Sequence, residues 1–325
     1  FAERYGGSDS DFTTLCIAIE ELARVDQSIA ITLEAAVGLG ISPIAEFGTE
    51  AQQDQWLPDL VAGRALAGFG LTEPGSGSDA SEITTRAELV DGTWIINGSK
   101  AFITNSGTEI TSLVTITAKT GPSEISSFII PTDTPGFEVE PAYDKMGWHA
   151  SDTHGLRFED CRVPEDHLLG TRGHGFRQFM SILDDGRIAI AALAVGVLQA
   201  CLEETTAYAK DRTSFGQSIG SYQAVAFRIA DIEVMAEAAR LLTYKAAWLK
   251  DTGQPYRHAA ARAKLYATES AVSATRMATQ IFGGAGFLDD TLVARHYRDA
   301  KVLEIGEGTS EIQRIVIARG LGLDV

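Results

Sequence analysis

Ile305-Gly306-Glu307-Gly308-Thr309-Ser310-Glu311 is the stretch from which we interpret the fold. It places one carboxylate, Glu307, between two glycines, after one amphipathic helical run and before another over 312–319. Glycine on both sides permits a sharp turn and the close approach of a flat ligand, because no β-carbon intervenes. The stretch predicts either a carboxylate that reaches into a cavity or an ordinary helix–helix connector with a solvated glutamate.

Long helical patterns surround this loop. Apolar residues recur at helical spacing, as over 225–239, and Gly253 follows the end of that run. Long helices with short connections favour an antiparallel bundle, and abundant alanine allows close packing. The predicted helices of this bundle cover 176–211, 222–251, 256–282 and 292–304.

The middle of the chain differs in composition, because its short apolar runs are rich in β-branched and aromatic residues. Asp91-Gly92 and Asn97-Gly98 are two-residue signals typical of hairpin turns. Closely spaced short strands with turn residues between them indicate a small antiparallel barrel or sandwich. The expected strands lie within 83–90, 93–97, 101–104, 113–118, 127–130 and 155–158.

The first part of the chain is predicted to be helical. Residues 29–44 are almost entirely apolar and small, which suits a helix buried on all sides, and Gly48 followed by Thr49 indicates a stop and a capped start. The sequence therefore predicts a mostly α fold with a central β-barrel. The expected domains are an N-terminal helical domain over 1–66, a β-barrel over 67–170 and a C-terminal helical bundle over 171–325.

Composition excludes several function classes. Hydrophobic residues make up 45% and charged residues 22% of the chain, and the net charge is −17. This acidic balance argues against a nucleic-acid surface. The three cysteines are far apart, which favours a reducing compartment and no metal. No apolar run approaches the roughly 18 residues of a membrane span, and no signal peptide is visible. We therefore expect a cytoplasmic or mitochondrial-matrix protein; Phe1 in place of Met suggests a missing upstream segment.

The densest turn, Leu71–Asp79, contains a Gly-x-Gly-x-x-Ala pattern at Gly75, Gly77 and Ala80. We reject a dinucleotide fingerprint, because the pattern must open a helix and here a strand is expected to follow. The loop is either a ligand-gripping loop or a plain hairpin loop. Likewise, Asp211–Gly216 and Gln280–Phe287 end helices with residues that suit either a phosphate ligand or ordinary C-terminal capping.

Taken together and in this order, the segments resemble the acyl-CoA dehydrogenase family over nearly the whole chain. The family fold is an N-terminal helical domain, a central β-barrel and a C-terminal four-helix bundle, and it usually starts a few tens of residues earlier. Each motif is weak alone, but six in register are specific. The matching motifs are Tyr5–Gly7, Leu71–Asp79, Ile96–Asn105, Asp211–Gly216, Gln280–Gly284 and Glu307–Thr309.

The resemblance implies FAD between barrel and bundle, a homotetramer built as a dimer of dimers, and no metal. By this likeness the isoalloxazine ring is lined by Phe69, Leu71, Thr72, Phe102, Ile103 and Thr104. The pyrophosphate and adenosine are held, partly from a second subunit, by Arg212, Phe215, Gln223, Gln280, Gly283 and Gly284. Also expected near the cofactor are Ser78, Thr309 and Glu311, although many relatives have glutamine in place of Glu311 and tryptophan in place of Phe102.

The resemblance also implies a mechanism. Glu307 matches the base that removes the thioester α-proton while flavin N5 takes the β-hydride, which gives a trans-2-enoyl-CoA and sends electrons to an electron-transfer flavoprotein. Some relatives carry the base where Gly186 stands here, and glycine cannot take a proton. The positions that match acyl-CoA contacts are Ser78, Ser151, Asp184, Arg187 and Gly308.

Two questions stay open at this stage. Gly306 replaces a common tyrosine, so we hypothesise a larger acyl cavity and a branched or bulkier substrate. The alternatives to a dehydrogenase are an oxidase or flavin monooxygenase on the same fold, or a non-catalytic homologue that binds CoA or flavin. Glu307 argues against the monooxygenase, and a non-catalytic homologue predicts loss of the base or of the flavin loop, neither of which is lost.

Overall fold

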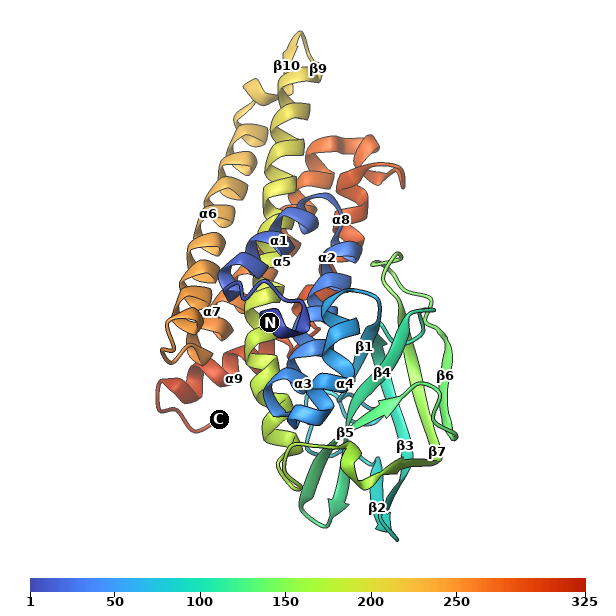
Figure 1. Ribbon diagram of the computed structural model, residues 1–325. Helices are drawn as coiled ribbons and strands as arrows, with labels where there is room; N and C mark the ends of the chain where they lie inside the picture. The colour runs from blue at the N-terminus through green and yellow to red at the C-terminus, as the bar shows by residue number, and fades with distance from the viewer. The chain divides into compact units, whose positions relative to one another are not determined.

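The computed structural model describes residues 1–325, which divide into two compact units (Figure 1). Unit 1 contains the β-sheet with short helices, and unit 2 contains most of the long helices. Unit 1 comprises Phe1–Ser10, Thr32–Asp144 and Ser151–Gly186, and unit 2 comprises Asp11–Ile31, Lys145–Ala150 and Arg187–Val325. The expected division into three domains stays a prediction.

An eight-stranded sheet forms the centre of unit 1 in the order β6-β7-β3-β2-β4-β5-β8, with β1 paired to β4. Its strands are β1 Leu66–Gly70, β2 Arg86–Val90, β3 Thr93–Thr104, β4 Thr111–Gly121, β5 Glu124–Pro131, β6 Phe137–Ala142, β7 Thr153–Pro164 and β8 Leu168–Leu169. The end strands β6 and β8 do not pair, so the sheet is open, which corrects the expectation of a closed barrel. β8 has two residues, too few to extend the ladder further. β1 and β2 both run parallel to β4, so the sheet is not purely antiparallel.

The two expected hairpin turns have different outcomes. Asp91 and Gly92 have φ of +49° and +75° and join β2 to β3, which confirms the first. The second is wrong, because Asn97 and Gly98 lie inside β3, at a register shift against β7. Glycine is needed at position 98 for a close approach, since a β-carbon there would lie 2.4 Å from Thr85 Oγ1.

The N-terminal helices are shorter than expected. The predicted helix over 29–44 divides into three pieces, and Ile29 is 48% exposed, so it is not buried on all sides. The π-helical middle piece suits its glycines, since a β-carbon at Gly40 would lie 2.7 Å from Ala67 O. Thr49 and Gln52 form the expected cap. The elements are η1 Glu3–Tyr5, α1 Phe12–Val25, α2 Gln27–Glu34, η2 Ala35–Ile41, α3 Ser42–Phe47 and α4 Glu50–Val61.

Three of the four expected bundle helices are confirmed to within one residue. The fourth, over 292–304, is a short α-helix followed by a 3-10 turn. Buried alanines at three- and four-residue spacing line α7, which allows its neighbours to pack closely. The helices are α5 Gly175–Asp211, α6 Gln223–Asp251, α7 Arg257–Phe282, α8 Leu292–Ala300 and α9 Ser310–Gly320; the 3-10 turns are η3 Glu165–His167, η4 Ile219–Ser221, η5 Gly283–Phe287 and η6 Lys301–Glu304; the small strands are β9 Thr213–Ser214 and β10 Gln217–Ser218.

Two helical segments, Gln27–Phe47 and Gly175–Asp211, are long and apolar enough to cross a membrane by length and composition. This corrects the expectation that no apolar run reaches that length. Their apolar windows are 56% and 78% buried inside the protein, as the core helices of a folded domain are.

Candidate active site

Glu307 lies in a tight turn between η6 and α9. Its φ of +53° and the φ of +94° at Gly308 place two consecutive residues in left-handed conformations. For a non-glycine residue this conformation costs roughly 1–3 kcal/mol, and such strain gathers at functional sites. The Oε2 atom of Glu307 is buried. The turn therefore directs that oxygen into the protein rather than into bulk water.

Two buried side chains hold the carbonyl group of Gly308. Lys264 Nζ on α7 donates to this oxygen at 2.5 Å, and Gln313 Nε2 on α9 donates at 2.8 Å. Neither side chain has exposed surface. Thr309 caps α9 and accepts from the Ile312 N–H at 3.4 Å. The turn is thus held by side chains from two helices, α7 and α9.

Charged groups surround the Lys264 ammonium. Burial lowers the pKa of Lys264 to about 8, and the negative charge of Glu307 opposes that shift. The charges of Arg187, Glu304 and Glu311 also act on it. Of the predicted site residues, Gly308 contacts Lys264 directly, and Glu307, Arg187 and Glu311 lie near enough in unit 2 for their charges to act on it.

The predicted acyl-CoA contacts Ser78, Ser151 and Asp184 belong to unit 1. Ser78 is exposed on the 71–79 loop, whereas Ser151 is buried. The chain continues from Ala80 into β2 without a helix, which confirms that the glycine pattern is no dinucleotide fingerprint.

A buried ion pair supports the loop that begins at Leu71. Lys100 Nζ lies 2.8 Å from Glu73 Oε1 and also donates to Leu71 O and Thr117 Oγ1, each at 3.3 Å. Burial by itself would raise the pKa of Glu73, but the Lys100 charge and the hydrogen bonds to this carboxylate lower it to about 2. The pair fixes the backbone next to the predicted flavin residues Leu71 and Thr72.

The predicted flavin residues of unit 1 differ in what they offer a ligand. Phe69, Leu71 and Ile103 have buried side chains in hydrophobic clusters, so any ligand contact from them is through the backbone. Thr72 and Thr104 are partly exposed. Phe102 adopts φ +61°, is 66% exposed and lies 5.2 Å from Tyr143 between ring centroids. An exposed aromatic ring on a strained backbone is available for stacking.

The predicted adenosine-side residues of unit 2 are also open. β9 and β10 form a hairpin at the tip of α5 and α6, where Phe215 is 96% exposed with φ +52° (Figure 1). The neighbouring Arg212 guanidinium makes no ion pair, and Gln223 and Gln280 are exposed. β-carbons at Gly283 or Gly284 would meet no atom within 4 Å, and Gly283 has φ +59° and ψ −132°.

These features fit the three parts of FAD. A flat ring suits the exposed aromatic surface, a diphosphate suits an unpaired guanidinium, and an adenosine can approach a bare glycine backbone. Thr309 and Glu311 stand at the N-terminus of α9, where hydrogen bonds from the backbone and from Thr309 lower the pKa of Glu311.

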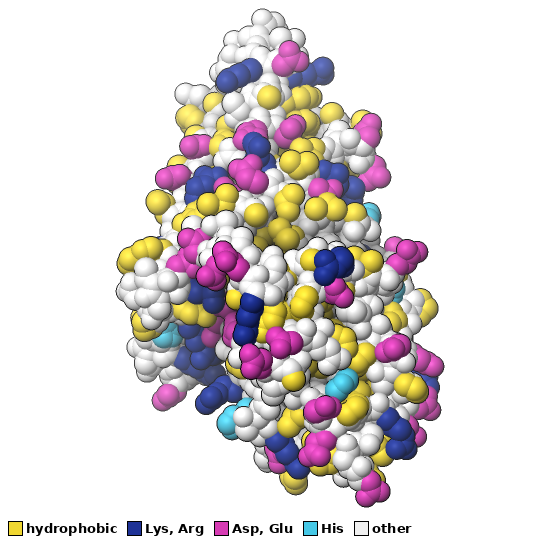
Figure 2. Space-filling view, viewed as in Figure 1, with side chains coloured by type: hydrophobic (Ala, Val, Ile, Leu, Met, Phe, Trp, Pro, Cys, Tyr) yellow, Lys and Arg dark blue, Asp and Glu magenta, His cyan; other side chains and the backbone are white.

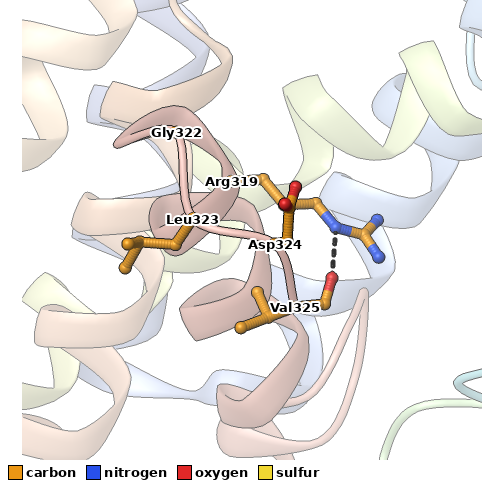
Figure 3. Close-up of a pocket in the computed structure, with 5 residues that line it drawn as sticks. All are labelled: Arg319, Gly322, Leu323, Asp324 and Val325. Atoms are coloured by element: carbon orange, nitrogen blue, oxygen red, sulfur yellow. Dashed lines mark hydrogen bonds between the residues drawn. The ribbon is translucent and has the colours of Figure 1, made fainter.

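Two surface hollows lie away from the predicted site residues. One of about 560 Å³ is lined by the end of α9 and the C-terminal tail, where Arg319 Nε donates to Val325 O at 2.8 Å (Figure 3). A second, of about 500 Å³, lies in unit 1 among Ser106, Thr132, Glu140 and His154. Neither is lined by any predicted site residue, so we assign no chemistry to them.

Sequence reasoning missed Lys264, Gln313 and the Glu73–Lys100 pair. The signal for Lys264 is a lysine at a core position of α7, among the buried Ala260, Ala263 and Ala267. No local pattern marks the ion pair, since its partners are 27 residues apart along the chain.

Family comparisons cover nearly the whole chain. Three family profiles match, described as the acyl-CoA dehydrogenase N-terminal domain over residues 1–64, middle domain over 68–161 and C-terminal domain over 173–322. A probable acyl-CoA dehydrogenase of Bacillus subtilis is 49% identical over 99% of this chain and 85% of its own length.

Solved structures give the same result. Butyryl-CoA dehydrogenase from Megasphaera elsdenii superposes with a TM-score of 0.96 at 44% identity, covering 99% of this chain and 86% of that one. A chain from a structure described as the electron transferring flavoprotein of Acidaminococcus fermentans gives a TM-score of 0.97 at 44% identity, covering 100% and 86%.

Proposed function

Because this chain belongs to the acyl-CoA dehydrogenase family, we propose that Glu307 is the base that removes the α-proton of an acyl-CoA thioester. The observation that carries the proposal is the buried Oε2 of a carboxylate held in a left-handed turn. Anaerobic bleaching of the bound flavin by acyl-CoA tests it.

The enzyme is an FAD-dependent oxidoreductase that converts an acyl-CoA to the trans-2-enoyl-CoA. When bound, FAD would supply the redox chemistry, as the acceptor of a hydride equivalent from the substrate. The protein binds and orients the thioester, excludes water and removes the proton.

A thioester α-proton is far too weakly acidic for a carboxylate in water. Two effects close this gap. Hydrogen bonds to the thioester carbonyl, including one from the backbone N–H of Glu307, stabilise the developing enolate. An acyl chain that excludes water makes the carboxylate a stronger base.

We assign the remaining site residues by their chemistry. Phe102, with the backbone of its strand and of the Leu71–Thr72 turn, contacts the flavin ring. Arg212, Phe215, Gln223 and the backbone at Gln280–Gly284 contact the diphosphate and adenosine. Ser78, Ser151, Asp184, Arg187 and Gly308 contact the acyl-CoA, and Thr309 and Glu311 approach the cofactor.

Gly306 leads us to propose a branched or bulky acyl group as the substrate. A β-carbon at Gly306 would meet only Val302 O, at an ordinary 3.6 Å, so a larger side chain could begin at this position without a clash. Relatives that carry the butyryl-CoA name show that a small acyl group suits the fold.

Gly306→Tyr is expected to lower kcat/KM for branched acyl-CoAs by about tenfold or more relative to butyryl-CoA, because the new ring fills the space beside the base. The measurement is turnover across matched linear and branched acyl-CoAs for both proteins. A wild-type enzyme with a strict butyryl preference would contradict the proposal.

We propose an electron-transfer flavoprotein as the electron acceptor. The structural similarity to a chain from the structure described as the electron transferring flavoprotein of Acidaminococcus fermentans supports this proposal. Reoxidation by oxygen with release of peroxide, at a rate comparable to turnover, would instead indicate an oxidase.

We also propose that the enzyme is a homotetramer, a dimer of dimers, in which α6 contacts a second copy. Phe227, Val234, Leu241 and Trp248 are exposed at seven-residue intervals along this helix. A stripe with this period is typical of helix–helix association. A self-complementary partner suits it, because most soluble oligomers are symmetric.

Leu241→Glu is expected to shift the protein to a smaller assembly, because a charge in an apolar contact is desolvated without a partner. Light scattering after size-exclusion chromatography measures the mass. Val90→Glu, at an exposed apolar residue of β2 in unit 1, is the matched control. An unchanged mass for Leu241→Glu would remove α6 from the interface.

No nucleic acid or membrane is proposed as a partner. Acidic and basic side chains both occur over the face shown in Figure 2, and the net charge of the chain is −17. Because relatives come from bacteria and mitochondria, we propose the bacterial cytoplasm or the mitochondrial matrix as the compartment.

A further inference from the structure

We propose that Lys264 is a positioning residue for the base: its buried ammonium holds the Gly308 carbonyl and thereby fixes the turn that aims Glu307. The inference rests on the proposed role of Glu307. Lys264 Nζ lies 2.5 Å from Gly308 O, and no side-chain surface of Lys264 is exposed.

The turn needs an external support. Glu307 and Gly308 both have positive φ, a conformation that the glutamate would leave if the following carbonyl were free to rotate. Lys264 and Gln313 hold that carbonyl from two different helices. Removing either donor therefore loosens the Gly308–Thr309 peptide, one residue beyond the base.

Hydrogen bonding alone does not explain a lysine at this position. Gln313 already donates to the same oxygen without a charge. Lys264 stands among Ala260, Ala263 and Ala267, which are fully buried, so an apolar side chain would suit the packing better. A buried ammonium is disfavoured by desolvation. Because burying the Lys264 ammonium is unfavourable, its presence at this position points to a role in the candidate active site.

The positive charge of Lys264 also acts on the carboxylate of Glu307. Glu307, Glu304 and Glu311 are anions whose charges act on the lysine, and Arg187 is the opposing cation. A cation near Glu307 favours the ionised carboxylate, which is the form that accepts a proton. Lys264 therefore orients the base, and its charge attracts the anionic carboxylate.

Lys264→Met tests both parts. We expect kcat to fall about tenfold or more with KM changed less than about threefold, because orientation of the base affects the transition state more than binding. The acid limb of the kcat–pH profile should move to higher pH by about half a unit or more. The thermal unfolding midpoint should not fall, because methionine fills the same apolar space.

Three variants separate the outcomes. Arg262→Met removes an exposed cation from the same helix and should change none of these quantities. Gln313→Leu should lower kcat without moving the acid limb. If Lys264→Met does not accumulate as a flavoprotein, Lys264→Gln replaces it, with the same shift of the acid limb expected.

A Lys264→Met enzyme with kcat within twofold of wild type, or with a lower unfolding midpoint and an unmoved acid limb, would show a purely structural lysine. Glu307→Gln distinguishes this failure from failure of the proposed function. If Glu307→Gln is inactive while Lys264→Met is fully active, only the positioning role is wrong.

Discussion

Glu307→Gln is expected to give a yellow protein whose flavin is no longer bleached by acyl-CoA under anaerobic conditions. An amide of the same shape cannot accept a proton, and general base catalysis contributes about 10²–10⁴-fold. We expect the rate of flavin reduction to fall by about 10³-fold, which corresponds to about 4 kcal/mol of transition-state stabilisation.

The variant should still fold and bind FAD. Glutamine has nearly the same volume, and the contacts that fix the turn come from Lys264, Gln313 and Thr309 rather than from the carboxylate. Flavin content and the unfolding midpoint should therefore stay near wild type. This separates loss of chemistry from loss of structure.

The matched control is Glu269→Gln, which neutralises an exposed carboxylate of α7 that pairs with Arg314. An exposed pair of this kind contributes little to stability, so reduction should proceed at close to the wild-type rate. Ordinary bleaching of Glu307→Gln by the acyl-CoA panel would move the base to another residue.

The helices of the bundle could be predicted from sequence because their signals are local. Long apolar and alanine-rich patterns mark α5, α6 and α7. A glycine lies just after the end of α6 and of α7, so the bounds of these helices follow from neighbouring residues. The Asp91–Gly92 turn is local in the same sense, since both residues adopt the positive φ that this turn requires.

What could not be predicted depends on contacts distant in sequence. Gly98 is glycine because Thr85 packs against it, not because the chain turns there. Whether the sheet closes depends on the pairing of its end strands, which no short pattern specifies. Within the candidate site, the motif at 305–311 predicted Glu307 from sequence alone. The role of Lys264 depends on its contact with Gly308, 44 residues away in the chain, which only the folded structure shows.

Lys100→Met is expected to destabilise the folded protein by about 3–5 kcal/mol, because it leaves the buried Glu73 carboxylate without its cation. Both residues have almost no exposed surface, and the ammonium lies 2.8 Å from Glu73 Oε1. Loss of the bond to Leu71 O should also loosen the backbone proposed to contact the flavin, so FAD should dissociate at a lower temperature. Thermal unfolding followed by circular dichroism and by flavin fluorescence measures the two effects.

The pH dependence of this pair has a definite sign. The pKa of Glu73 is lowered to about 2 in the folded protein from an ordinary 4.5. Its ionised form therefore stabilises the wild type above about pH 4.5, and this contribution is lost as pH falls toward 2. In Lys100→Met the unpaired carboxyl instead favours protonation, so acid relieves the defect. The difference between the unfolding midpoints of wild type and variant should narrow as the pH is lowered from 7.

A double variant separates an unpaired charge from lost packing. Glu73→Gln/Lys100→Met has no buried charge, and an amide oxygen at the Oε2 position can still accept from the N–H groups of Thr84 and Thr85. It should be more stable than Lys100→Met alone, a non-additivity expected for groups in direct contact. Arg64→Met, which breaks the exposed pair with Asp59 in the same unit, should cost less than about 1 kcal/mol. If Lys100→Met were as mild as Arg64→Met, the buried pair would not be what holds the turn at Leu71 and Thr72.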